Sequence, residues 1–231
     1  MPCWRWNRFA AARPPPLPHT ARPILCYVTG RAALPPETNG NLLPAIEAAI
    51  SAGIDWIQIR EKDLPTRALL DLARNAVSLA AGTNTKILIN DRLDVALASG
   101  AAGVHLGGQS APVADVVRWC RSGHAPDGFL VGASCHQLPE ALAAERDGAD
   151  YLFFGPVFDT PSKLAFGPPQ GIGRLSDICR AVHSIVLAIG GITLGNARDC
   201  ISAGARGIAA IRLFQQAGNL SPILDLLRKS E

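Results

Sequence analysis

One repeated pattern constrains the fold of this chain more than any other feature. A short apolar run typical of a buried strand is followed by a segment whose apolar residues recur at helical spacing. The eight predicted strands cover residues 24–29, 56–60, 86–90, 103–106, 130–134, 151–155, 185–189 and 207–211. The eight predicted helices cover residues 42–52, 66–81, 91–99, 113–120, 139–147, 173–182, 196–203 and 221–229.

Glycines close several of these helices and show how the units are connected. Gly53, Gly100, Gly148 and Gly204 each stand where a helix is expected to end, and glycine is the usual residue there. The next strand follows almost at once, which favours parallel strands joined by right-handed crossovers. We therefore predict a single α/β domain over residues 23–231, folded as a (β/α)8 TIM barrel.

An open, doubly wound sheet is the alternative architecture. Such a sheet would be expected to carry a glycine-rich dinucleotide fingerprint directly after its first strand. The residues at that place are Gly30-Arg31-Ala32-Ala33, which do not form one. The barrel therefore remains the favoured fold.

The amino-terminal residues 1–22 differ in composition from the rest of the chain. They contain four arginines, several prolines and no acidic residue, and we expect a disordered tail. Subtracting these four from the 22 basic residues of the chain leaves 18, against 19 acidic residues. The predicted barrel is therefore close to neutral, which argues against a nucleic-acid partner.

Two further observations concern the cellular setting. No apolar run is long enough to cross a membrane, so we expect no membrane partner. The six cysteines are scattered without a C-x-x-C pair, which favours reduced thiols in a cytoplasmic protein and makes a zinc site unlikely. The sequence leaves open whether the chain is a monomer or a homo-oligomer.

Polar residues gather where the predicted strands end, which is where the active site of such a barrel lies. Gln58 and Arg60 share one face of the second strand because side chains alternate, and Lys62 follows just beyond. Arginine offers a planar fork that matches phosphate oxygens, and lysine offers a mobile charge. This end of the strand therefore predicts a phosphate-binding pocket, although a solvated basic strand end would give the same residues.

At the other strand ends, each candidate site residue has two possible interpretations. Asp91, after Asn90, could bind a metal diphosphate or could cap the next helix. His105 is interpreted as a core residue, and His136 as a helix cap or a backbone contact. Gly190 and Gly191 could admit an anion or form a plain tight turn. The loop with Thr160, Ser162 and Lys163 could cradle phosphate or be a solvated connection, and Arg212 could add a charge or lie at the surface.

Taken in order, these motifs resemble the thiamine-phosphate synthase and thiazole tautomerase superfamily, and the synthase branch more closely. The resemblance spans residues 24–227 and also implies a (β/α)8 barrel. The matching stretches are Gln58-Ile59-Arg60-Glu61-Lys62, Ile89-Asn90-Asp91, Val104-His105-Leu106-Gly107, Gly132-Ala133-Ser134-Cys135-His136, Gly148-Ala149-Asp150-Tyr151, Gly155-Pro156-Val157-Phe158 with Thr160-Pro161-Ser162-Lys163, and Ile189-Gly190-Gly191-Ile192.

The resemblance implies an enzyme of thiamine biosynthesis that joins hydroxymethylpyrimidine diphosphate to thiazole phosphate and releases diphosphate. It implies that Arg60, Lys62, Ser134 and Lys163 are catalytic, and that Asp91 binds Mg²⁺ as the cofactor. Residues implied to hold the pyrimidine diphosphate are Gln58, Arg60, Lys62, Asn90, Ser134 and Lys163. Residues implied to surround the thiazole phosphate are Thr160, Ser162, Gly190, Gly191, Ile211 and Arg212.

Two positions depart from the family pattern. Ser110 stands where the synthases carry a second metal-binding aspartate, and Arg212 stands where a serine is usual. A serine hydroxyl or a water can still ligate Mg²⁺, so Ser110 is kept as a metal candidate.

Two rival functions follow from the same motifs. A thiazole tautomerase would use a histidine in the loop after the sixth strand, where this chain has Pro156. A non-catalytic barrel that binds a thiamine precursor is the other rival, and Ser110 is its main support. Asp91 and Lys163 favour the synthase over both.

Overall fold

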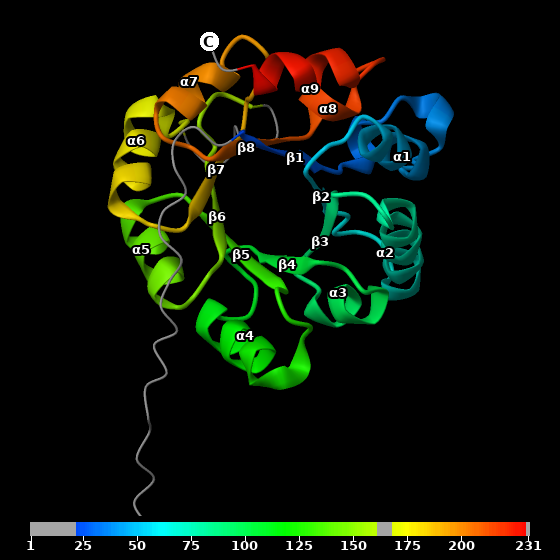
Figure 1. Cartoon of the computed structure of the whole chain (residues 1–231), viewed down its shortest axis with the longest axis horizontal. Helices are drawn as coiled ribbons and strands as arrows, with labels where there is room; N and C mark the ends of the chain where they lie inside the picture. The colour runs from blue at the N-terminus through cyan, green and yellow to red at the C-terminus, as the bar shows by residue number, and fades with distance from the viewer. Residues whose placement is uncertain (1–21, 161–167, 230–231) are drawn as a thin grey trace, which may run out of the picture.

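The chain closes eight parallel strands into a barrel, in which each strand pairs with its sequence neighbours and β8 pairs with β1 (Figure 1). The structure is a computed structural model that describes residues 22–160 and 168–229. Apart from Arg22, the segment predicted to be a disordered tail lies outside the described residues. The strands are β1(Ile24–Val28), β2(Trp56–Ile59), β3(Lys86–Asn90), β4(Gly103–Leu106), β5(Leu130–Cys135), β6(Tyr151–Phe154), β7(Ile185–Ile189) and β8(Gly207–Ala210).

Helices surround the barrel as an outer ring, so the predicted (β/α)8 fold is confirmed (Figure 1). They are α1(Leu43–Ser51), α2(Thr66–Ala80), α3(Leu93–Ser99), α4(Val113–Trp119), α5(Leu138–Arg146), α6(Gly171–Ala181), α7(Ala197–Ser202), α8(Arg212–Gln215) and α9(Ser221–Arg228). Three short helical segments lie in the connections: η1(Arg31–Ala33) and η2(Pro36–Thr38) between β1 and α1, and η3(Cys120–His124) directly after α4. The turns η1 and η2 and the short helix α8 were not predicted, because segments this short carry no apolar period.

Side chains alternate along each strand and divide the apolar core into two parts. One part lies between the sheet and the helices, and includes Ile57 and Ile59 of β2 packed with helix residues such as Ile46 and Leu69. The other contains strand residues of the opposite parity and fills the barrel interior: Cys26, Val28, Trp56, Leu88, Tyr151, Phe153, Leu187 and Ala209. This two-sided burial explains why the strands read as continuous apolar runs.

Aromatic rings fill much of the barrel interior. The Trp56 and Tyr151 rings meet edge to face with centroids 4.9 Å apart, and Phe153 lies 4.3 Å from the His105 ring. Gly132 makes room for this packing, because a Cβ atom there would lie 2.0 Å from Cζ of Tyr151. A barrel filled in this way is a packed core and not a pore, so ligands are confined to its ends.

At the amino-terminal end of the strands, one carboxylate ties both ends of the described chain together. Asp55 accepts hydrogen bonds from the Leu25 N–H at 2.9 Å and from the guanidinium of Arg22. Arg228, the last residue of α9, approaches the same carboxylate to 3.4 Å and donates to the Gly53 carbonyl at 2.6 Å. This cluster fastens β1, β2 and α9 at the face opposite the predicted site.

The five cysteines in the described part of the chain are free thiols, and four of them are buried. Burial raises the pKa of Cys135, Cys179 and Cys200 to about 12 each, so these thiols stay protonated. This agrees with the prediction of reduced thiols. No helix among the described residues has the length and apolar character needed to span a bilayer.

His105 is buried in the barrel interior, as its interpretation as a core residue predicted. Its Nε2 lies 2.8 Å from Oγ of Ser134, and its Nδ1 lies 3.2 Å from the Tyr151 hydroxyl. Burial lowers the pKa of His105 to about 3; the negative charge of Asp91 opposes this shift and the positive charge of Arg60 adds to it. The ring is therefore neutral in the folded protein at neutral pH.

We expect the protein to lose stability as the pH falls from about 6.5 towards 3, because only the unfolded chain binds a proton at His105 in this window. Inside the window this group should lower the free energy of unfolding by about 1.4 kcal/mol per pH unit. Urea unfolding from pH 7 to pH 4.5 should show a shallower pH dependence for His105→Gln than for the parent protein. His124→Gln, at an exposed position, is the control. Equal slopes for His105→Gln and the parent would contradict the expectation.

Candidate active site at the carboxyl ends of the strands

A chain of hydrogen-bonded polar side chains begins inside the barrel and runs out along β2 and β3. The buried amide of Gln58 donates to Oδ1 of Asn90 at 3.0 Å. The amide of Asn90 then donates to Oδ2 of Asp91 at 2.7 Å. Each side chain is oriented by the next, so the predicted residues Gln58, Asn90 and Asp91 form one connected unit.

The backbone at Asp91 turns sharply as β3 ends. Its φ of 62° lies in the left-handed region, which aspartate tolerates better than most residues. The carboxylate accepts hydrogen bonds from the Ser110 hydroxyl and from the Gly107 N–H at 3.3 Å. The helix-cap interpretation of Asp91 is wrong, because α3 begins at Leu93 and no side chain caps it.

The carboxylate of Asp91 is held in its charged form. Partial burial works to raise its pKa, but the Ser110 hydroxyl, the Gly107 N–H, the positive charge of Lys62 and the Asn90 amide together lower it. A half-buried carboxylate that stays ionised beside a lysine is able to bind a cation or to position a basic group.

Arg60 and Lys62 follow the end of β2 and lie near this unit. Arg60 is partly exposed and acts electrostatically on His105, while Lys62 is exposed and acts on Asp91. Two strands beyond β3 in the barrel, β5 places Ser134, whose hydroxyl contacts His105. The structure thus brings Arg60, Lys62 and Ser134 to the same end of the barrel.

The glycine pair after β7 has two structural features. Both residues have positive φ, 97° for Gly190 and 67° for Gly191. A Cβ atom at Gly190 would lie 2.6 Å from Cα of Pro156, and one at Gly191 would lie 2.5 Å from the Asp159 carbonyl oxygen. The glycines are therefore required first for close packing against the loop after β6, a reason that the turn and anion interpretations did not include.

The same pair leaves backbone donors available. Within the described residues, the N–H groups of Gly191 and Ile192 have no hydrogen-bond acceptor. Consecutive N–H groups around residues of positive φ can form a concave anion site. The prediction that an anion approaches this loop is compatible with this arrangement and stays a prediction.

Helix α8 begins directly after β8 and carries two predicted residues at its start. Ile211 precedes the helix and packs against Gly30, where a Cβ atom would lie 3.2 Å from its Cγ2. Arg212 is the first helical residue and is exposed, with no carboxylate within ion-pairing distance among the described residues. A short helix after β8 is a common part of phosphate sites in such barrels.

The loop after β6 is described only in part. Thr160 is partly buried at the edge of the described residues, and the predicted residues Ser162 and Lys163 lie outside them. Pro156, at the position where a tautomerase would need a histidine, packs on Gly190. His136 contacts the backbone of this loop at the Gly155 carbonyl, as one of its interpretations predicted.

The donor set for a metal is small. Among the described residues, no group of three or more histidines, cysteines and carboxylates could hold a metal ion by itself. Asp91 with Ser110 remains, and Mg²⁺ is commonly bound by one or two carboxylates together with substrate phosphates and water. These two residues therefore fit a Mg²⁺ ion that arrives with a diphosphate, but not a tightly held resident metal.

Two buried residues near the site were not singled out from the sequence. Glu61 accepts hydrogen bonds from the Thr29 hydroxyl at 2.6 Å and from the Arg31 N–H at 3.2 Å. Gln215 in α8 contacts Gly30 and Tyr27. Burial of Glu61 could have been anticipated from its parity with Ile59, whereas Gln215 lies in a helix that gave no sequence signal.

Comparison with known proteins agrees with this geometry. The family described as "TMP-TENI: Thiamine monophosphate synthase" matches residues 25–214. A thiamine-phosphate synthase of Roseiflexus castenholzii is 41% identical over 198 residues, which cover 86% of this chain and 83% of the relative. A putative thiamine-phosphate synthase of Geobacter sulfurreducens is 45% identical over 171 residues, covering 74% of this chain and 78% of the relative.

A solved structure is similar over nearly the whole barrel. Thiamine phosphate pyrophosphorylase from Pyrococcus furiosus superposes with a TM-score of 0.75 and 32% sequence identity, over 88% of this chain and 93% of that chain. The family match over residues 25–214 includes Gln58, Asn90 and Ser134. The chain therefore belongs to the thiamine monophosphate synthase family.

Proposed function

We propose that this chain is a thiamine-phosphate synthase, which joins hydroxymethylpyrimidine diphosphate to thiazole phosphate and releases diphosphate. The observation that carries the proposal is the hydrogen-bonded series Gln58–Asn90–Asp91 beside Arg60 and Lys62, in a chain of this family. These residues offer amide donors, two positive charges and one ionised carboxylate at the end of a sealed barrel. That set suits a diphosphate that arrives with a divalent cation.

The reaction needs stabilisation of charge more than a strong base. The bond between the pyrimidine methylene carbon and the diphosphate oxygen breaks, and the thiazole nitrogen forms a new bond to that carbon. Negative charge grows on the departing diphosphate, so donors already in place lower the barrier. We assign this work to Arg60 and Lys62, with Lys163 as a third cation whose role remains a prediction.

Ser134 is proposed to donate a hydrogen bond to the departing diphosphate. Its hydroxyl contacts Nε2 of His105, which burial keeps neutral. In the tautomer that we propose, the Nε2–H donates to Oγ of Ser134, which leaves the hydroxyl proton for the diphosphate. Tyr151 contacts the other ring nitrogen and helps fix the ring. Ser134 is thus held in place by two buried residues.

We propose that Mg²⁺ bound with the diphosphate is held by Asp91 and Ser110. When bound, the ion would neutralise charge on the diphosphate oxygens. Asp91 is ionised and already hydrogen-bonded to Ser110, so both oxygens lie together before a ligand arrives.

The thiazole phosphate is proposed to bind between the loops after β6, β7 and β8. Support comes from the N–H groups of Gly191 and Ile192, which have no acceptor in the described part of the chain, and from the exposed guanidinium of Arg212. Thr160, Ser162, Gly190 and Ile211 complete this proposed half-site. Both substrates are small molecules, and the free buried thiols suit the reducing cytoplasm in which we place the reaction.

The rival functions have weaker support. Pro156 offers no proton to transfer at the position where a tautomerase would need a histidine. A non-catalytic binder would not require the ionised Asp91 to lie beside Lys62 and the Gln58–Asn90 pair.

The direct test mixes the purified protein with hydroxymethylpyrimidine diphosphate, thiazole phosphate and Mg²⁺. We expect thiamine phosphate and diphosphate to form in equal amounts, because one bond breaks for each bond made. EDTA should abolish the product, and excess Mg²⁺ should restore it. Tight binding of either substrate without any product would instead favour the tautomerase or the binder.

A second test concerns Ser110. In Ser110→Asp two carboxylates would lie together, so we expect half-maximal activity at a lower Mg²⁺ concentration, by about tenfold if one added ligand contributes about 1.4 kcal/mol. Without Mg²⁺ the like charges should repel, and the melting temperature of this variant should rise on adding Mg²⁺. Ser110→Asn adds an amide of similar size but no charge, and should show neither effect. An unchanged Mg²⁺ requirement in Ser110→Asp would show that this position does not face the metal.

A further inference from the structure

The buried side chain of Gln215 holds the backbone of Gly30 from both sides. Its Oε1 accepts a hydrogen bond from the Gly30 N–H at 3.1 Å, and its Nε2 donates to the Gly30 carbonyl at 2.8 Å. The Tyr27 hydroxyl donates to the same Oε1 at 2.9 Å. One amide group thus fixes the start of the connection between β1 and α1 (residues 29–42) to helix α8.

Gly30 is connected to the backbone of Arg60 through its neighbour Thr29. Thr29 precedes Gly30, and its hydroxyl accepts a hydrogen bond from the Arg60 N–H at 3.0 Å. The Thr29 N–H in turn donates to the Gln58 carbonyl at 2.9 Å. Arg60 lies just beyond the end of β2. The Thr29 hydroxyl therefore accepts the N–H hydrogen bond that a backbone carbonyl of the neighbouring strand would accept within the sheet.

The side chain of Glu61 also joins the end of β2 to the β1–α1 connection. One carboxylate oxygen accepts from the Thr29 hydroxyl at 2.6 Å, and the other accepts from the Arg31 backbone N–H at 3.2 Å and side chain Nε at 3.3 Å. The side chain of Glu61 is only 4% exposed, so these bonds are shielded from water. The end of β2 is held by polar contacts to residues 29–31.

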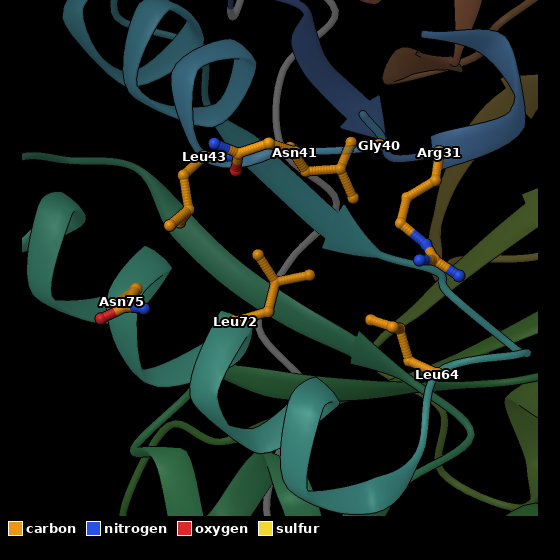
Figure 2. Close-up of a pocket in the computed structure, with 8 residues that line it drawn as sticks. Arg31, Gly40, Asn41, Leu43, Leu64, Leu72 and Asn75 are labelled. Atoms are coloured by element: carbon orange, nitrogen blue, oxygen red, sulfur yellow. The ribbon is translucent and has the colours of Figure 1, made fainter. Parts of the chain in front are cut away.

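Apolar packing anchors the β1–α1 connection mainly at its far end, where Leu42 is buried and Leu34 packs partly against the core. None of residues 31–41 is fully buried, and a cavity of about 220 Å³ lies between this connection and α2 (Figure 2). Figure 2 shows Arg31, Gly40 and Asn41 of the connection on one side of the cavity, and Leu64 with Leu72 and Asn75 of α2 on the other. Apart from the contact of Gly30 with Ile211 and the backbone bond of Thr29 to Gln58, residues 29–31 are held by Gln215 and Glu61.

We propose that Gln215 is a positioning residue for the reaction: through Gly30 and Thr29 it sets the backbone of Arg60 and so aims the guanidinium at the diphosphate. The proposal rests on the function proposed above and adds to it a residue of α8 that lies outside the substrate-binding set. It also predicts that helix α8 and strand β2 act as one unit in holding the diphosphate.

The first measurement is the binding of inorganic diphosphate with Mg²⁺ by calorimetry. Gln215→Leu keeps the approximate size but loses all three hydrogen bonds, and should weaken binding by about tenfold. Gln215→Glu keeps an acceptor for Tyr27 and the Gly30 N–H but cannot donate to the Gly30 carbonyl, so its loss should be smaller. Gln216→Leu, at the exposed residue directly after this helix, is the matched control and should bind as the parent does.

A double-mutant cycle separates positioning from general stability. The ratio kcat/KM for the pyrimidine diphosphate is measured for Gln215→Leu, Arg60→Ala and the double variant, since this ratio remains measurable after large losses. If Gln215 acts through Arg60, adding Gln215→Leu to the Arg60→Ala variant should lower kcat/KM only slightly further. Circular dichroism establishes that each variant is folded, and Gln215→Glu serves in place of Gln215→Leu should the latter not fold.

Two outcomes would overturn the proposal: diphosphate binding by the Gln215 variants within about twofold of the parent, or equal losses with and without Arg60. These outcomes are distinct from failure of the proposed function. If the parent forms no thiamine phosphate but Gln215→Leu still weakens diphosphate binding, the function is wrong and the positioning role stands. If product forms while the Gln215 variants bind normally, the reverse holds.

Discussion

The pairing of β8 with β1 is the interaction on which the rest of the structure depends. Once the sheet is closed, side chains of one parity must point into the barrel and those of the other parity must meet the helices. Tyr151 and Phe153 fill the interior, and Gly132 leaves the space that the Tyr151 ring needs. The polar residues proposed to meet the substrate then gather towards the carboxyl ends of the strands, where Gln58, Arg60 and Ser134 lie.

Closure alone does not orient those polar groups, and hydrogen bonds complete the task. Asp91 adopts a left-handed backbone that returns its carboxylate towards Asn90 and Ser110. Ser134 is held through His105. In each case a group proposed to meet the substrate is supported by a neighbour that is already satisfied, which is the arrangement that preorganised catalysis requires.

The strands and main helices followed from the sequence because their apolar periods are strong, and several strands begin and end where predicted. The family resemblance also located Gln58, Asn90 and Asp91 at one end of the barrel. Local chemistry was harder to anticipate. Asp91 could be interpreted as a helix cap, because an aspartate before a helix suits that role as well as it suits metal binding. Only its backbone angle and its hydrogen-bond partners decide against the cap.

The residues that sequence reasoning missed share a physical cause. Gln215 lies in a four-residue helix that is too short to show a period, and its partner Gly30 is almost at the other end of the chain. The glycine pair after β7 was recognised, but its close packing on Pro156 depends on a neighbouring loop. Contacts between distant segments such as these arise from closure, and no local pattern encodes them.

The carboxylate of Asp55 has a consequence for how the chain can be connected. Arg22 and Arg228 reach the same side chain from opposite ends of the described chain, on the face away from the proposed site. A short linker could therefore join these ends without crossing the strand ends that bind substrate, and new termini could be opened in an exposed connection elsewhere. The barrel is in this sense a ring of repeating units, whose order around the circle matters more than the point at which the polypeptide begins.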